Sequence, residues 1–152
     1  TYMRGLDRLD ADLVRSTYHD DATDDRGFFQ GSADEFAGFA MEALKDHHAN
    51  HHMLGQANID IEGDVAFGEI YFQAFHRTVE DGEEKDFVVW GRYVDRYEKR
   101  GGTWKIAHRS ELNDACSTVP AADDWFREVP SALRGARGAQ DRSSQRDIVR
   151  KL

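Results

Sequence analysis

The chain has 152 residues, of which 39% are hydrophobic and 32% charged, and its formal net charge is −9. This size and composition predict one globular domain with a substantial core and exclude a largely disordered chain. An acidic surface repels nucleic acids and anionic membranes, and no apolar run is long enough to cross a bilayer. The single cysteine, Cys116, cannot form an internal disulfide, so we expect a soluble cytoplasmic protein.

The first predicted element is a helix over residues 2–18. Apolar side chains recur there every three or four positions, the spacing that forms one apolar stripe on an α-helix. Because this pattern begins at once and Thr1 is not a methionine, we expect further residues to precede it in the native protein. The acidic residues 20–27 then predict a short extended segment or a loop.

A second helix is predicted to begin after Ser32. Ser32 and Glu35 have the spacing of a capping box, in which each side chain bonds the backbone N–H of the other residue. Aromatic and small apolar residues then recur at helical spacing as far as Leu44. The capping box and the periodicity agree on this helix.

Long strands are predicted for the rest of the domain. Stretches of alternating, β-branched or aromatic residues are separated by glycine-containing turns, over residues 51–62, 65–79, 86–100 and 103–119. Gly68 and Gly91 lie inside these strands, as expected where a sheet bends or bulges. Helices followed by hairpin-linked strands predict an α+β fold, in which a curved, mostly antiparallel sheet wraps around the N-terminal helices and encloses a conical cavity.

The C-terminal part of the chain differs from the rest in charge. Residues 127–152 carry seven Arg/Lys and three Asp/Glu, a net charge of +4, whereas residues 1–126 carry −13. We therefore expect a domain over residues 1–126 and a basic tail or docking arm over residues 127–152. Residues 144–152 fit either a short helix capped by Ser144 or a solvated tail, and the tail could promote self-association.

Four segments resemble the NTF2-like superfamily, in particular its SnoaL-like branch, which includes scytalone dehydratase, bile-acid 7α-dehydratase and LinA-type dehydrochlorinase. The segments occur in the family's order and spacing within about residues 2–126, and are Tyr2–Asp10, His52–Ala66, Gly91–Glu98 and Gly102–Arg109. The resemblance implies a cone-shaped NTF2-like or cystatin-like fold and a homo-oligomer, either a trimer or a dimer. The superfamily hosts dehydratases, isomerases, cyclases and non-catalytic modules, so the fold alone does not specify the activity.

The resemblance also implies a catalytic pair, Asp7 and His52. In the related enzymes the histidine removes a proton from a substrate carbon, and the aspartate holds the other ring nitrogen. Tyr2 matches the position of a tyrosine in bile-acid dehydratase, and Arg109 matches a pocket arginine. The sequence contains no phosphate-binding glycine loop, no Gly-x-Ser-x-Gly motif and no His-Glu-x-x-His motif, so we expect chemistry without a cofactor.

The residues themselves leave alternatives open. Asp7 could be a solvated carboxylate on the flank of its helix. Strand alternation places His51 on the face of Ile59 and His52 on the other face, but it does not say which face lines the cavity, and a bulge near Gly55 would invert the count. Only the resemblance selects His52.

Tyr2 and Arg109 also have simpler interpretations. Tyr2 lies five residues before Asp7, about 140° around a helix, and on its own it is typical of a core residue. Arg109 follows a small residue on a strand, where an arginine is either paired or solvated. Inside an apolar cavity, however, its guanidinium would bind a leaving group or a developing oxyanion.

The histidine-rich stretch between residues 47 and 52 does not have the ligand spacing of a zinc site, so we expect no metal there. Five apolar residues are candidate walls of the cavity, although residues of this type are also typical of ordinary core. They are Phe28, Leu54, Tyr71, Phe75 and Trp90.

The functional hypothesis is a cofactor-free lyase that acts on a small apolar, ring-containing molecule. Proton abstraction and elimination would make it similar to a dehydratase, and a retro-aldol release of formaldehyde would use the same base. The alternatives are an isomerase of the same fold, a non-catalytic ligand-binding module, or a module similar to the small subunit of a ring-hydroxylating dioxygenase.

Overall fold

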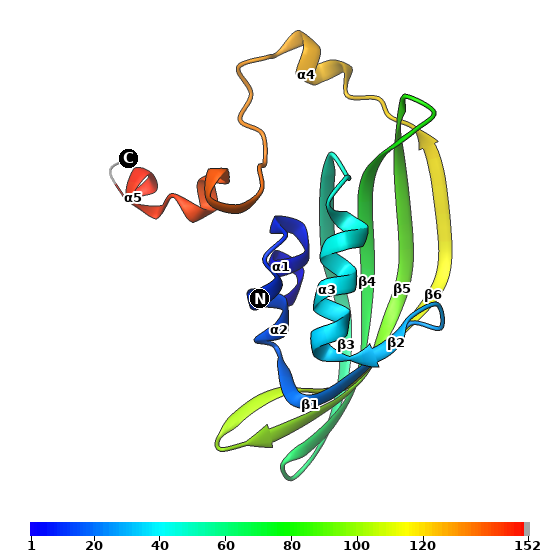
Figure 1. The fold of residues 1–152 in the computed structure, drawn as a ribbon, viewed down its shortest axis with the longest axis vertical. Coiled ribbons are helices and arrows are strands. Elements are labelled where there is room, and N and C mark those ends of the chain that lie inside the picture. Colours follow the sequence, from blue (N-terminus) through cyan, green and yellow to red (C-terminus); the bar gives the residue numbers. More distant parts are fainter. Residues whose placement is uncertain (151–152) are drawn as a thin grey trace.

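The computed structural model describes residues 1–150 and contains one six-stranded sheet in the order β2-β1-β6-β5-β4-β3. The β1 and β6 strands are parallel and all other neighbours are antiparallel, and the sheet curves around the helices (Figure 1). The predicted α+β class and mostly antiparallel sheet are confirmed. The strands are β1 (Tyr18–Asp25), β2 (Gln30–Ser32), β3 (Ala49–Glu62), β4 (Val65–Glu80), β5 (Glu83–Arg100) and β6 (Thr103–Pro120).

The predicted helix over residues 2–18 is two short helices, α1 (Tyr2–Arg8) and α2 (Ala11–Arg15). The chain breaks at Leu9, which adopts a left-handed conformation with φ 54°. Asp10 then begins a new helix, because its carboxylate accepts the backbone N–H of Leu13 at 2.9 Å. The prediction of one continuous helix was wrong, since the apolar spacing carries over the break.

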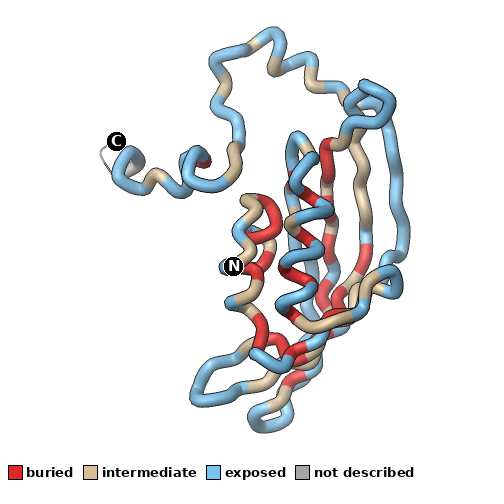
Figure 2. Tube along the Cα trace, viewed as in Figure 1, coloured by how far each residue is buried: buried red, intermediate tan, exposed pale blue. Residues whose placement is uncertain are grey.

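The second predicted helix is α3 (Ala33–Leu44), and its capping box is present. The Ser32 hydroxyl accepts the N–H of Glu35 at 3.3 Å, and the Glu35 carboxylate accepts the N–H of Ser32 at 2.8 Å. Phe36 and Ala40 are among the residues that this helix buries. Buried and exposed positions recur along α3, so that one side of the helix is covered (Figure 2). A capping box typically stabilises a helix by about 1 kcal/mol, and packing of the buried apolar face of α3 stabilises it further.

The acidic stretch that was predicted as an extended segment or a loop is the eight-residue strand β1. It pairs with β6 in parallel and with β2 in antiparallel orientation. Ala22 and Asp24 point into the core, where each is 1% exposed. Buried and exposed residues alternate only from Ala22 onward, because Tyr18 and His19 are both buried, and one of the buried residues of the strand is a carboxylate.

Gly91 lies at a bend of the sheet. The register between β5 and β6 shifts between Trp90 and Gly91, which confirms the bulge expected there. A Cβ at Gly91 would lie 2.2 Å from the carbonyl oxygen of Leu112, so only glycine fits without a backbone shift. At Gly68 the ladder is regular instead.

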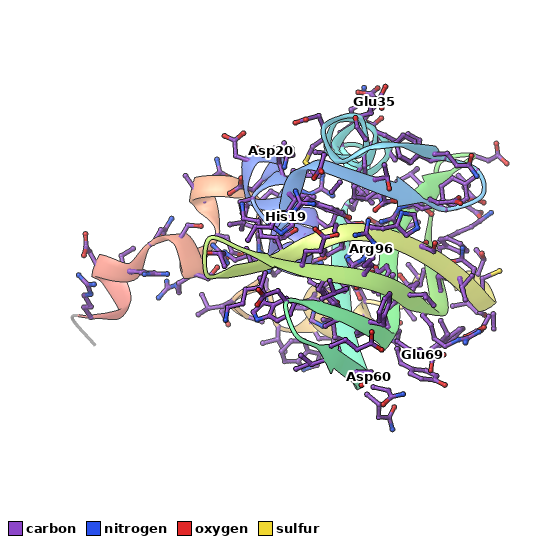
Figure 3. All side chains as sticks on the ribbon, turned by 90° about the horizontal axis from the view of Figure 1, so that it is seen from below. His19, Asp20, Glu35, Asp60, Glu69 and Arg96 are labelled. Carbon is purple, nitrogen blue, oxygen red and sulfur yellow. The ribbon has the colours of Figure 1, made fainter. Side chains whose placement is uncertain are left out.

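Helices and sheet form two layers, and acidic residues project from both sides. Viewed from below, Glu35 projects from the side of α3, whereas Asp60 and Glu69 project from the opposite side, on β3 and β4 (Figure 3). The core between the layers is rich in aromatic side chains, including Tyr2, Tyr18, Phe36, Phe72 and Tyr93. No helix within residues 1–150 is long and apolar enough to span a bilayer.

After β6 the chain forms a strap, which we define as residues 121–150. It contains α4 (Asp124–Glu128), the 3₁₀ turns η1 (Gly138–Gln140) and η2 (Arg142–Ser144), and α5 (Arg146–Val149). The strap leaves one end of the sheet and returns alongside α1 (Figure 1).

The strap contacts α1 of its own chain. Arg4 donates to the Ser143 hydroxyl at 2.6 Å, and Arg8 pairs with Asp141 at 3.4 Å. The helix predicted over residues 144–152 is a single turn that begins after Gln145, and Ser144 belongs to the preceding 3₁₀ turn. Residues 151–152 of that prediction lie outside the described residues.

Candidate active site

A cavity of about 470 Å³ lies between α3 and the concave face of the sheet. Its walls are mostly apolar and include Leu6, Phe28, Phe36, Phe39, Phe72, Phe87, Val89 and Tyr93. The volume suits a small ring-containing molecule, since ligand sites usually measure about 300–1,000 Å³.

Two groups of polar residues line this cavity. We call His47, His52 and His76 the histidine end, and Arg26, Glu111 and Asn113 the arginine end. His52 lies on β3 and Glu111 on β6, with β4 and β5 between them, so the two groups lie at different places on the cavity wall.

The structure brings Asp7 and His52 together. Asp7 Oδ1 lies 2.7 Å from His52 Nδ1, and the backbone N–H of His52 donates to both carboxylate oxygens at 3.1 Å. The two side chains are only 11% and 6% exposed, respectively. An ionised carboxylate only accepts hydrogen bonds, so Nδ1 of neutral His52 carries the proton and Nε2 keeps its lone pair.

A bulge in β3 decides which histidine faces the cavity. The register between β3 and β4 shifts between Leu54 and Ala57, so His52 lies on the same face as Ile59. Simple alternation placed His51 on that face, and the bulge inverts the count. His51 instead lines a second hollow between the strap and the body of the protein.

This second hollow has a volume of about 630 Å³ and a more charged lining. Asp7 lines it together with His51, Arg77, Arg134 and Arg137. Asp7 lines the second hollow and His52 lines the cavity, so the hydrogen bond between them lies at the boundary of the two.

His76 completes the histidine end, and the sequence analysis did not identify it. Its ring centroid lies 5.2 Å from that of His52 and 5.1 Å from that of His47, and its Nδ1 lies 2.9 Å from the side-chain amide of Asn50. Burial, and then the nearby His52 and His47, lower the pKa of His76 to about 3. His76 is therefore neutral at physiological pH. His76 follows Phe72 and Ala74 at every second position of β4, and this alternation could have placed it on the same face of the strand.

Arg26 is the arginine of the cavity, and it too was missed. Its Nε donates to Asp24 at 2.8 Å, Nη2 donates to the hydroxyl of Tyr2 at 2.7 Å, and Nη1 pairs with Glu111. The guanidinium also lies 4.0 Å from the ring centroid of Phe36. Burial by itself would lower the pKa of Arg26, but Tyr2, Glu111 and Asp24 outweigh it and raise the pKa well above its ordinary value.

Contrary to the expectation, Arg109 does not line the cavity. It is 4% exposed and forms a bidentate pair with Asp95, with N···O distances of 2.8 and 2.6 Å. Its guanidinium lies 3.9 Å from the ring centroid of Tyr93, a residue of the cavity wall. The paired alternative describes Arg109, because the carboxylate beside it on β5 accepts from Nε and Nη2, although the buried Nη1 has no hydrogen-bond partner within the described residues.

Tyr2 is likewise placed behind the wall. Its ring packs against Tyr18, Phe36 and Tyr93, and its hydroxyl bonds Arg26. Tyr2 therefore supports the arginine end from the core, which agrees with its interpretation as a core residue.

Of the five candidate wall residues, Phe28 lines the cavity and Phe75 lines the second hollow. Tyr71 and Trp90 lie on the outer face, because alternate residues such as Phe72 and Val89 point inward. Leu54 lies next to the bulge in β3. Leu54, Tyr71 and Trp90 are 50%, 46% and 41% exposed and are not part of the cavity wall.

Within residues 1–150, no group of three or more His, Cys, Asp or Glu residues has an arrangement that could hold a metal ion. The histidine end is therefore three imidazoles without a carboxylate or thiolate placed to complete a metal site. Acid–base chemistry is what this arrangement can perform.

Solved structures share this fold. A hexachlorocyclohexane dehydrochlorinase of LinA type 2 aligns with a TM-score of 0.70 at 18% identity, covering 79% of this chain and 82% of that chain. A candidate scytalone dehydratase from Novosphingobium aromaticivorans DSM 12444 aligns with a TM-score of 0.69 at 18% identity, covering 80% and 82%. A cystatin-like protein of unknown function from Nostoc punctiforme PCC 73102 gives 0.60 at 22% identity, covering 74% and 83%.

At these identities the structural likeness establishes the fold, and no curated protein matches the sequence. The family assignment comes from the sequence, which matches the SnoaL-like domain over residues 1–110. That match includes Asp7, Arg26 and His52. The chain therefore belongs to the SnoaL-like family within the NTF2-like superfamily.

Proposed function

We propose that the protein is a cofactor-independent lyase that uses His52 as a base on a small, neutral, ring-containing substrate. The observation that carries this proposal is the 2.7 Å contact between Asp7 Oδ1 and His52 Nδ1 at the wall of an apolar cavity. This contact leaves Nε2 of a cavity-lining imidazole free to accept a proton.

The proposed reaction is an elimination. Nε2 of His52 takes a proton from a substrate carbon, and the electron pair of that C–H bond forms the new double bond. The leaving group departs from the adjacent carbon with its own electron pair, as a halide, or as water after it receives the proton from the imidazolium. Asp7 stabilises the imidazolium while it exists, because the two opposite charges lie in a water-poor site.

The arginine end supports a neutral substrate. The donors of Arg26 are directed at Asp24, Glu111 and Tyr2, and two carboxylates against one guanidinium leave this group with a net negative charge. A substrate carboxylate would be repelled there, whereas a hydroxyl could donate to Glu111. Aromatic walls at Phe36 and Phe72 favour a flat or cyclic hydrocarbon frame.

The structural likeness to a hexachlorocyclohexane dehydrochlorinase makes chlorinated cyclohexanes the first probes, followed by cyclic alcohols that carry an acidic C–H beside the hydroxyl-bearing carbon. Halide release and loss of water, followed by mass spectrometry, measure turnover. We expect His52→Ala to lower the rate about 10²–10⁴-fold, the usual contribution of a general base.

His51→Ala is the matched control, because His51 is the adjacent residue and faces the second hollow. Undiminished turnover in His52→Ala would contradict the proposal. A product isomeric with the substrate would assign an isomerase, and tight binding of the probes without any product would assign a binding module.

We also propose that the protein forms a homo-oligomer, a dimer or a trimer. The strand register places the half-exposed Tyr71, Trp90, Val94 and Leu112 on the outer face of the sheet, around Arg92, which pairs with Glu69 and Asp114. Exposed apolar residues gathered on one face are typical of a contact between subunits. Light scattering on the purified chain measures the assembly, and a monomer at micromolar concentration would contradict it.

A further inference from the structure

The side chain of Asn50 lies at the centre of a buried polar cluster behind the histidine end. Asn50 is 6% exposed. One atom of its terminal amide lies 2.8 Å from Nδ1 of His47 and 2.9 Å from Nδ1 of His76, and the other lies 3.0 Å from Nη2 of Arg137 on the strap. A single amide thus connects the strap to two histidines of the cavity.

Hydrogen-bonding chemistry determines which way this amide faces. A guanidinium can only donate hydrogen bonds, so the amide atom beside Arg137 is the oxygen. The amide nitrogen then faces His47 and His76, and it also lies 3.1 Å from the carbonyl oxygen of Ala49. An amide nitrogen donates hydrogen bonds and does not accept them, so a proton on either Nδ1 would point at a donor. The proton of each neutral imidazole therefore lies on Nε2. The opposite orientation would set donors of Asn50 against donors of Arg137.

We propose that Arg137 is a positioning residue, which orients the Asn50 amide and thereby holds His47 and His76 in the tautomer protonated at Nε2. Both histidines line the cavity, and His76 packs against His52. The strap therefore determines which nitrogen of each ring can donate a hydrogen bond and which can only accept one.

Arg137 is itself held in place by the end of α3. Its Nη1 donates to the carbonyl oxygen of Lys45 at 2.8 Å, and its Nη2 donates to that of His47. Carbonyls at a helix C-terminus lack partners within the helix, and a cation there also interacts favourably with the helix dipole. Removing the guanidinium removes the donor that opposes a 180° turn of the Asn50 amide, and the carbonyl oxygen of Ala49, 3.1 Å from the amide nitrogen, then opposes the turn alone.

The test is nuclear magnetic resonance of the full chain with ¹⁵N-labelled histidine. Long-range ¹H–¹⁵N correlations distinguish the two neutral tautomers, and His47→Gln and His76→Gln variants assign the signals. We expect a single tautomer, protonated at Nε2, for both residues in the wild type. Arg137→Ala should convert His76 to a mixture or to the tautomer protonated at Nδ1. Arg137→Lys should preserve the wild-type state, since an ammonium group also donates.

Arg134→Ala is the matched control, because Arg134 is a strap arginine that pairs with Asp123 at 3.2 Å. A wild type protonated at Nδ1, or an Arg137→Ala variant with unchanged tautomers, would overturn the proposal. It would also fail if Arg134→Ala produced the same change, because docking of the strap in general would then be the cause.

A second variant tests the amide independently of the strap. Asn50→Asp replaces the donor with a carboxylate that only accepts hydrogen bonds, so His47 and His76 must then carry a proton on Nδ1. If His76 remained protonated only at Nε2 in this variant, the proposal would be wrong. None of these measurements needs a substrate, so their outcome is independent of the proposed lyase activity.

Discussion

The two polar ends of the cavity use buried charge in different ways. At the histidine end, Asp7 occupies one nitrogen of His52 and leaves the other with a free lone pair. At the arginine end, Asp24 and Glu111 are both paired with Arg26. The comparison shows that a buried polar group is available for chemistry only where its partners leave one atom unused. In the proposed mechanism the arginine end contributes shape and polarity, and the histidine end contributes reactivity.

The largest expected effect comes from breaking the histidine end. Asp7→Asn would keep the size of the side chain but lose its negative charge, so the His52 imidazolium would no longer be stabilised. We expect kcat to fall about 10²–10⁴-fold with a smaller change in KM, measured by initial rates on a probe from the screen proposed above that the wild type turns over.

Asp10→Asn is the control for this change. Asp10 caps α2 on the surface, and asparagine caps helices as well as aspartate does. If both variants lost activity equally, the loss would reflect the N-terminal helices and not the contact with His52.

Breaking the arginine end should affect stability instead. Arg26→Ala would leave Asp24 and Glu111 buried without their cation, and removing one partner of a buried pair typically costs about 3–5 kcal/mol. Urea unfolding measures this loss in the free energy of unfolding. Arg96→Ala removes an exposed partner of Glu98 and should change stability little. A small effect of Arg26→Ala would show that the arginine end does not depend on charge compensation.

A smaller effect concerns pH. The folded-state pKa of His76 is about 3, below the value of about 6.5 in an unfolded chain. Between these values the unfolded chain binds more protons, so the free energy of unfolding falls as the pH falls. From pH 7 to pH 5 the loss due to His76 should be about 2 kcal/mol.

Denaturant titrations at several pH values measure this slope. His76→Gln should flatten it. His19 is the comparison, because burial and then the nearby Arg100 and Lys105 also lower its pKa, but by less. If His19→Gln flattened the profile more than His76→Gln, the histidine end would not be the main buried titrating group.

Features whose signals lie within a few residues could be predicted from the sequence. The capping box of Ser32 and Glu35 and the four long strands depend on local spacing, and both are present. The break at Leu9 was missed because the apolar repeat continues through it. Asp10, a strong helix-capping residue within that repeat, was the signal for a second helix start.

The site was less predictable because it depends on register and on buried charge. The resemblance selected Asp7 and His52, whereas strand parity alone did not, since the bulge between Leu54 and Ala57 reverses it. Arg26 was missed because it follows a run of acidic residues, and such a run is typical of a loop. In the structure this run is a strand, and Asp24, the partner of Arg26, is only 1% exposed. A polar residue that is buried by partners far along the chain leaves no hydrophobic pattern.

The open edge of the sheet has a consequence for variants of this protein. β3 is an outermost strand, and Asp7 accepts one of its backbone N–H groups. Unpaired edge strands are templates for aggregation, so this carboxylate protects solubility as well as orienting an imidazole. Under the proposed mechanism, solubility and activity therefore depend on the same side chain. An engineer who removes the chemistry while keeping the scaffold has to supply another acceptor at this edge.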